Sequence, residues 1–279
     1  MSWVLVNSEP LMEFERPTLH KVVDIGGLGV HKPKPLSEEW DRILNLRKHT
    51  ILISFGSVAK SKFMPESMKM AIINVVKSYP NITFIWKYEQ PDDAIFEGVD
   101  NLVPSKWTPQ SCLLGDKRLT LFITHGGAGS MMESAQQAKP LIVVPLFGDQ
   151  TRNARLIEKF GSGILLKKRH ITDSNMLRKA IEQILTDSRY QKAANRISRL
   201  LSRRPFSPEE KLVKTIELAA EFGDLPELKV AGRNLGYIAY YNLDLSIILA
   251  AISAVFVYLV LCASLRIFTH FIKVKVKVH

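Results

Sequence analysis

Near its C-terminus the chain carries about 21 consecutive residues without a charged side chain, from Leu245 to Leu265. At about 1.5 Å of rise per residue, a helix of this length measures about 31 Å, which is the thickness of a bilayer's hydrocarbon core. A buried core helix of this length would normally carry polar positions. The run therefore predicts one transmembrane helix, at residues 244–266.

The residues that flank this run predict its orientation. Three tyrosines precede it, as in the aromatic belt of a membrane interface: Tyr237, Tyr240 and Tyr241. Asp244 lies on the same side, and four basic residues follow the run: Arg266, Lys273, Lys275 and Lys277. By the positive-inside rule, residues 267–279 form a cytosolic basic tail, and residues 226–243 form a juxtamembrane segment on the other side.

The tail also carries a targeting pattern, because Lys277 and Lys275 stand third and fifth from the C-terminus. This spacing resembles the dilysine signal that retrieves type I membrane proteins to the endoplasmic reticulum, and a solvated basic tail is the alternative. Residues 1–7 show no basic region followed by an apolar region, so no signal peptide is predicted there. Either the sequence is a fragment or a variant, or its topology differs from the one that the tail implies.

The charge balance favours two classes of binding partner. With 38 Lys and Arg against 27 Asp and Glu, the net charge is +11, which favours nucleic acid or a membrane surface. Five basic residues form one stripe of a predicted helix: Arg189, Lys192, Arg196, Arg199 and Arg203. A solvated face is the preferred interpretation and contact with anionic lipid the alternative. Because no aromatic residues interleave with the stripe, we expect no nucleic-acid partner.

The central part alternates short apolar strands with amphipathic helices. Strands are predicted at 51–55, 82–86, 121–124, 141–144 and 164–166. Helices are predicted to begin at Pro65, near Ser130, at Thr151 and at Thr172 or Asp173. This alternation predicts an α/β fold with a doubly wound parallel sheet. Residues 1–35 contain four prolines and a glycine cluster, and we interpret them as irregular linker.

A glycine-rich turn is the most informative stretch for function. The strand that ends at Thr124 is followed by His125 and by glycines at 126, 127 and 129, and a helix begins near Ser130. The free N–H groups and the positive dipole end of such a helix form an anion site, for which a diphosphate is a natural occupant. His125 and Ser130 would add side-chain donors.

Other polar and aromatic residues surround this turn. Glu133 lies about one helical turn further on, close enough to accept hydrogen bonds from ribose hydroxyls. Asp149 and Gln150 follow the next strand, at the edge where open α/β sheets bind ligands, and suit a sugar. Trp107 offers a stacking face for a base, with Gln110 nearby. Taken alone, each of these residues could serve the structure and not ligand binding. A glycine-rich turn also occurs in dinucleotide-binding proteins, but their motif G-x-G-x-x-G is absent here.

As a constellation, residues 107–150 resemble the nucleotide-sugar signature of the UDP-glycosyltransferases, and most closely the membrane-bound UDP-glucuronosyltransferases. Segments at 5–10, 14–17, 53–57, 228–232 and 240–244 resemble the same family. The resemblance implies the GT-B fold, in which two Rossmann-like domains face each other and the C-terminal one holds a UDP-sugar. Residues 41–225 would be that domain, and residues 1–40 a remnant of the interdomain linker.

The resemblance also implies the roles of individual residues. Trp107 and Gln110 would contact uracil and ribose, and Glu133 the ribose hydroxyls. The diphosphate would be held by Ser57, His125, Gly127 and Ser130, and Thr124 would also belong to the UDP-sugar site. Asp149 and Gln150 would contact the sugar. Two departures from the family pattern are Gly129 in place of asparagine and Ala138 in place of glycine.

The implied reaction transfers glucuronate, or another hexose, from UDP to a small lipophilic acceptor with inversion and without a metal or cofactor. The resemblance implies that the family's catalytic histidine, its supporting aspartate and the acceptor pocket belong to an N-terminal half that this chain lacks. His125 is therefore assigned to the donor side, no catalytic residue is expected here, and this chain alone is expected to be inactive. The implied partners are UDP-glucuronate or UDP-glucose, the acceptor, a membrane crossed once, and further copies or homologues in an oligomer. The alternative is a silent membrane-anchored partner that regulates a full-length enzyme.

One glycosylation triplet, Asn81-Ile82-Thr83, precedes a predicted strand. In a full-length parent with a signal peptide, we expect the large domain and Asn81 in the lumen of the endoplasmic reticulum and the tail in the cytosol.

Overall fold

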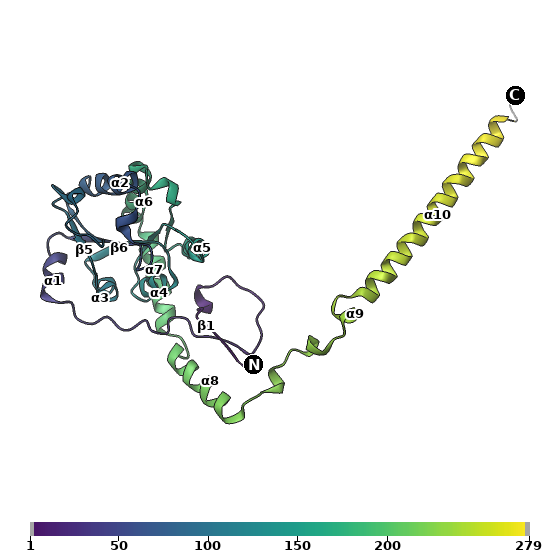
Figure 1. Ribbon diagram of the computed structural model, residues 1–279, viewed down its shortest axis with the longest axis horizontal. Coiled ribbons are helices and arrows are strands. Elements are labelled where there is room, and N and C mark those ends of the chain that lie inside the picture. The colour runs from purple at the N-terminus through teal and green to yellow at the C-terminus, as the bar shows by residue number, and fades with distance from the viewer. Residues whose placement is uncertain (1–2, 277–279) are drawn as a thin grey trace. The chain divides into compact units, whose positions relative to one another are not determined.

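The computed structural model describes residues 3–276, and the chain divides into one compact unit from Trp3 to Phe222 and a second that begins at Gly223. The first unit contains a six-stranded sheet of entirely parallel strands in the order β5-β4-β3-β6-β7-β8. Figure 1 shows this sheet between two layers of helices. Its strands are β3 (His49–Ser54), β4 (Ile82–Lys87), β5 (Leu102–Ser105), β6 (Leu119–Thr124), β7 (Leu141–Val143) and β8 (Gly163–Leu165). The sheet grows outward from β3 on one side and from β6 on the other, which is the doubly wound order. The predicted α/β class is confirmed.

Helices cover both faces of this sheet. On one face lie α2 (Glu66–Lys77) and α6 (Ser174–Thr186). On the other lie α1 (Glu38–Leu44), α3 (Gln110–Gly115), α4 (Ala128–Gln136), α5 (Gln150–Phe160) and α7 (Ser188–Ser202). Four of the five basic residues of the stripe lie on the exposed side of α7, and Arg203, which is also exposed, follows the end of the helix.

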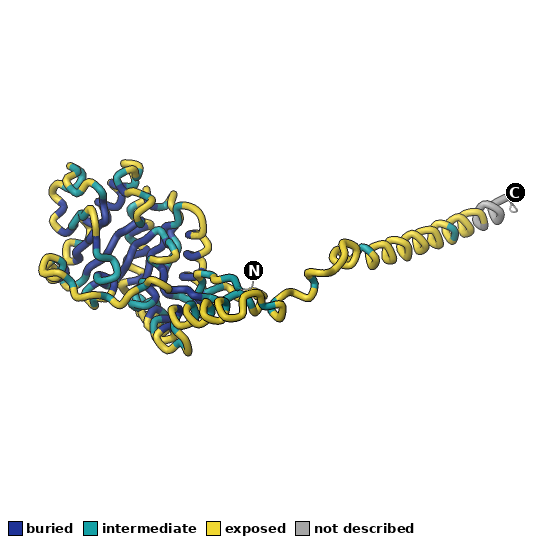
Figure 2. Tube along the Cα trace, turned by 60° about the horizontal axis from the view of Figure 1, so that its bottom comes forward, coloured by how far each residue is buried: buried dark blue, intermediate teal, exposed yellow. Residues whose placement is uncertain are grey.

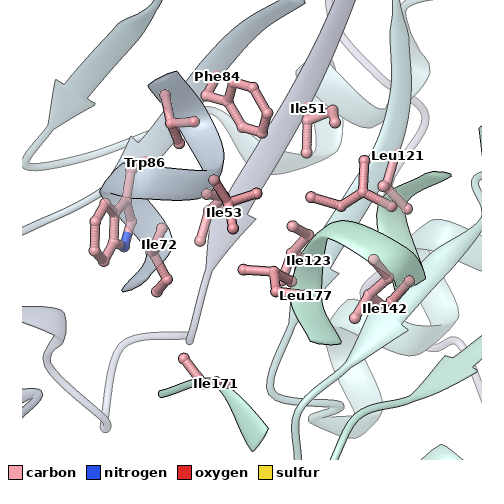
Figure 3. Packing of buried hydrophobic residues seen from close by; sticks show 14 of the residues in the cluster. Ile51, Ile53, Ile72, Phe84, Trp86, Leu121, Ile123, Ile142, Ile171 and Leu177 are labelled. Carbon is pink, nitrogen blue, oxygen red and sulfur yellow. The ribbon is translucent and has the colours of Figure 1, made fainter. Parts of the chain in front are cut away.

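The strands are apolar throughout because successive side chains enter opposite cores. Ile51 and Ile53 of β3 pack with Trp86 of β4 in the core beneath α2 and α6 (Figure 3). Leu52 and Ile85, from the same two strands, enter the core on the other face. Both cores are almost completely shielded from solvent, so the sheet is a rigid platform for the loops at its edge.

After the N-terminal segment, four elements of the first unit were not predicted from the sequence, namely α1, β5, α3 and the helix α8 (Pro208–Phe222). Strand β5 is four residues long and contains Pro104, which cannot donate a ladder hydrogen bond. It is tolerated because β5 is an edge strand. The apolar part of β5 is too short to show the two-residue periodicity that predicts a strand.

The N-terminal segment is more ordered than the irregular stretch predicted for residues 1–35. Strand β1 (Val4–Val6) pairs in parallel with β2 (Val22–Asp24), and Met12 between them is only 2% exposed. The buried carboxylate of Glu9 pairs with the Arg204 guanidinium, which also donates to the Gly26 carbonyl. These contacts attach the segment to the first unit. Its assignment as an interdomain linker stays a prediction.

Replacing Glu9 with alanine should destabilise the first unit by about 3 kcal/mol, because it leaves the largely buried Arg204 charge without its partner. Chemical unfolding followed by tryptophan fluorescence measures this change. The matched control is Glu15→Ala, an exposed carboxylate whose loss should cost less than about 0.5 kcal/mol. Equal effects of the two substitutions would contradict the attachment of the segment through Glu9.

The second unit ends in the long helix α10 (Leu243–Val276), preceded by the short helix α9 (Tyr237–Tyr240). Its stretch Leu243–Thr269 has a mean hydropathy of 2.7 and is not buried, as the exposed colour along the helix shows (Figure 2). The helix is therefore long and apolar enough to cross a membrane. The predicted retrieval signal depends on Lys277, which lies outside the described residues.

Candidate functional site

A cavity of about 490 Å³ opens beside the carboxyl ends of β3 and β6, where the strand order reverses. Open α/β sheets bind ligands at this point because the helices that follow the two strands leave to opposite faces. Seven of the ten residues predicted to hold the UDP-sugar line this one cavity: Ser57, Trp107, Gln110, His125, Gly127, Ser130 and Glu133.

The turn after β6 depends on two glycines. Gly126 has a φ of +85°, and a Cβ atom there would lie 2.4 Å from Cγ1 of Val143 on β7. A Cβ atom on Gly127 would lie 2.6 Å from Nε2 of His125. The glycines therefore let the backbone turn sharply and let the imidazole lie flat against it.

Helix α4 points its unsatisfied N-terminus at the cavity. Its N-cap residue is Gly127, which has no side chain to accept the first N–H groups. The first intrahelical bond is donated by the Met131 N–H to the Gly127 carbonyl, so the N–H groups of residues 128–130 have no intrahelical acceptor. Together with the helix dipole they form an anion site.

A polar network joins α3 to α4 along one wall. The Glu133 carboxylate accepts hydrogen bonds from the Gln110 amide and, at 2.7 Å, from the Ser111 hydroxyl. The Gln110 amide also donates to Ser130 Oγ at 3.2 Å. The network fixes the Glu133 carboxylate beside the helix N-terminus, where its remaining lone pairs can accept from a ligand's hydroxyls.

The cavity is also lined by a basic residue that was not predicted from the sequence. Lys87, the last residue of β4, lines the cavity and donates from Nζ to the Gly56 carbonyl at 2.8 Å. The same ammonium lies 5.9 Å from the ring centroid of Trp107, which is 70% exposed, and 3.7 Å from Glu89. A charged residue at the end of an otherwise apolar parallel strand was the signal available, because that end faces the ligand edge.

Other lining residues were not predicted as site residues. Ser54 is the last residue of β3 and Gly56 follows it in the turn, Thr108 precedes the unpredicted helix α3, and Ser111 and Cys112 belong to that helix. Burial lowers the pKa of His125, and the nearby Asp149 carboxylate partly offsets this effect; the lowered pKa favours the neutral imidazole. Within residues 3–276, no group of histidine, cysteine and carboxylate side chains is placed to hold a metal.

Three predicted residues lie outside this cavity. Thr124 is fully buried at the end of β6, beneath His125. Gln150 is buried as well, and its Oε1 accepts from the backbone N–H groups of Leu146 and Phe147, so this oxygen stabilises its own turn. Asp149 lines a smaller neighbouring cavity of about 130 Å³, which shares only Ala128 and Gly129 with the first. Their roles in binding stay predictions.

Asn153 connects Asp149 to the glycine turn through two hydrogen bonds. Its Nδ2 donates to the Gly126 carbonyl at 2.9 Å and to Asp149 Oδ2 at 2.8 Å. The start of α5 is thereby positioned relative to the start of α4.

Replacing Gly126 with alanine should destabilise the fold by at least about 2 kcal/mol and weaken ligand binding, because the Cβ atom meets Val143 in a left-handed backbone conformation. Gly129→Ala is the matched control, since a Cβ atom there meets nothing within 4 Å. It should leave the fold as stable as the wild type or up to about 1 kcal/mol more stable. Urea unfolding of both variants measures the difference, and a stable Gly126→Ala variant would refute this account of the turn.

Comparisons with known proteins identify the family. The family described as UDP-glucoronosyl and UDP-glucosyl transferase matches residues 1–278. The chain is 35% identical over 263 residues to ugt-48 of Caenorhabditis elegans, which is named among the UDP-glucuronosyltransferases, with 92% of this chain and 50% of that protein covered. It is 31% identical over 260 residues to UDP-glucuronosyltransferase 1A7 of Mus musculus, covering 92% and 48%. The chain thus spans about half the length of the curated relatives it matches.

Solved structures resemble the fold at low sequence identity. The glycotransferase of kitacinnamycin superposes with a TM-score of 0.60 at 18% identity, covering 79% of this chain and 55% of that one. UDP-glucose: anthocyanidin 3-O-glucosyltransferase in complex with UDP gives a TM-score of 0.57 at 21% identity, covering 68% and 45%. At these sequence identities the structural similarity is evidence for the fold alone.

Proposed function

The chain belongs to the UDP-glucoronosyl and UDP-glucosyl transferase family, and from this premise we propose that it is the donor-binding half of a UDP-sugar-dependent glycosyltransferase. Its fold is the Rossmann-like C-terminal domain of a GT-B glycosyltransferase with one added apolar helix. The transferred group is glucuronate or another hexose, and the acceptor is a small lipophilic molecule.

One observation carries this proposal: a single cavity combines an open helix N-terminus, a fixed carboxylate and an exposed indole. The free N–H groups of α4 suit a diphosphate, and Lys87 adds a positive charge across the cavity. Glu133 suits the two ribose hydroxyls, and Trp107 suits a stacked base. These are the parts of UDP, in the order in which they are joined.

The chemistry is a displacement with inversion. The acceptor oxygen attacks the anomeric carbon from the face opposite UDP, and the bond from that carbon to the diphosphate oxygen breaks. The α4 N-terminus stabilises the negative charge that develops on the leaving diphosphate. Removal of the acceptor's proton is assigned to a histidine outside this chain, because the His125 imidazole packs against the donor-side turn.

The proposed setting is a membrane. Helix α10 would cross it once, with the basic tail in the cytosol and the large unit in the lumen of the endoplasmic reticulum, as expected for a parent protein with a signal peptide. Asn81 is exposed at the start of β4 and is the proposed lumenal glycosylation site. The alternative role as a silent regulator receives no support from the comparisons.

Replacing Glu133 with alanine should weaken UDP binding by about 1–3 kcal/mol, because the ribose hydroxyls lose a charged acceptor and Gln110 loses its partner. Titration calorimetry with UDP on the full chain in lipid nanodiscs measures this. Glu182→Ala, an exposed carboxylate on α6, is the control and should bind UDP as the wild type does. If the folded wild-type chain binds no UDP, the proposed function fails.

A further inference from the structure

The basic stripe of α7 takes no part in the donor cavity. It consists of five exposed residues, none of which lines that cavity: Arg189, Lys192, Arg196, Arg199 and Arg203. At 3.6 residues per turn, their spacings of three and four keep the four members on the helix within a sector of about 80°. Exposure is expected for a solvated face and for a lipid contact alike, so the charges around the stripe have to distinguish the two.

No counter-charge lies along the stripe. Residues 188–204 contain no aspartate and no glutamate. Among the described residues Arg189 pairs with Asp187, and the other four members of the stripe form no ion pair. Four cationic side chains are therefore available to an external partner.

Acidic residues on the elements that pack against α7 are engaged with other groups. Glu133 of α4 lines the donor cavity, and Glu9 pairs with Arg204. On α6, burial and the Glu182 carboxylate together raise the pKa of Tyr79, so Glu182 acts on a residue outside the stripe. The neighbouring elements therefore do not neutralise the stripe.

The spacing of the stripe has an energetic cost. Residues of like charge three or four positions apart on a helix repel each other and destabilise it, as Lys192 and Arg196, or Arg196 and Arg199, do here. Water and dissolved ions only screen this repulsion. A negatively charged surface along the stripe would convert it into attraction, which favours an anionic partner over a face that is merely solvated.

The chain itself indicates which anionic surface is at hand. Helix α10 is long and apolar enough to cross a membrane, and the segment 223–242 joins it to the first unit. This segment extends at most about 70 Å, so a bilayer crossed by α10 stays within reach of the first unit. Lysine and arginine side chains close to a bilayer are attracted by anionic headgroups.

We propose that the basic stripe binds the anionic headgroups of a phospholipid bilayer and so attaches the first unit to a membrane surface. The inference goes beyond the proposed function and does not depend on UDP-sugar binding. It requires that α10 cross a membrane, which brings headgroups within reach. Because the attraction is electrostatic, it should weaken as salt shortens the Debye length.

The test is sedimentation of the full chain, held in nanodiscs of neutral phosphatidylcholine, with added sucrose-loaded vesicles. Vesicles that contain phosphatidylserine should pellet the chain, and vesicles of phosphatidylcholine alone should not. Raising the salt concentration from about 0.05 M to about 0.5 M should release it. Combining Lys192→Gln, Arg196→Gln and Arg199→Gln should weaken the binding about 100-fold, since each cation near such a surface contributes about fivefold.

The matched control combines Lys60→Gln, Lys117→Gln and Lys214→Gln, three exposed lysines outside the stripe whose loss lowers the net charge equally. It should weaken vesicle binding less than about threefold, because charges beyond a Debye length of the bilayer are screened. Equal losses in the two triple variants would assign the binding to net charge and overturn the proposal. So would equal pelleting with and without phosphatidylserine.

UDP affinity, measured on the same chains, separates this proposal from the proposed function. It should be the same in the wild type and in both triple variants, because none of the substituted residues lines the donor cavity. A wild-type chain that docks on the anionic vesicles but binds no UDP supports the attachment and refutes the proposed function. A chain that binds UDP but docks on neither kind of vesicle refutes the attachment alone.

Discussion

The reversal of strand order between β3 and β6 is the constraint on which the rest of the molecule depends. Because the sheet grows outward from these two neighbours, the helices that follow them, α2 and α4, pack on opposite faces. The carboxyl ends of β3 and β6 are therefore left uncovered, and the donor cavity lies at this edge. Two nearly solvent-free cores keep the edge rigid, so that the positions of the loop residues are determined by the sheet.

Electrostatics then decides what the uncovered edge can hold. The α4 N-terminus directs unsatisfied N–H groups at the cavity, and the Lys87 ammonium faces it from β4. Both favour an anion, whereas the Glu133 carboxylate, fixed by Gln110 and Ser111, favours hydroxyl groups. A ligand with a diphosphate next to a ribose satisfies both requirements, and neither an inorganic anion nor a free sugar does.

The sequence was sufficient to predict five of the six strands of the main sheet, because strands buried on both faces are apolar runs that end at glycine or a polar residue. It also predicted seven of the residues that line the donor cavity, because the glycine turn, the residues near it and the family resemblance pointed to them. It could not show that the Gln150 amide oxygen accepts from its own turn, since that depends on the path of residues 146–149. It missed Ser111 and β5 because a six-residue helix and an edge strand with a proline carry no periodic signal.

The most direct test of this account is hydrogen exchange of the full chain in nanodiscs with and without UDP. The account predicts that UDP slows exchange of the backbone N–H groups of residues 128–130, which have no intrahelical acceptor, and of the segment 107–112. It predicts no change in α6, on the far side of one core. Protection confined to other segments, or no protection at a UDP concentration that saturates binding, would contradict the assignment of the α4 N-terminus as the diphosphate site.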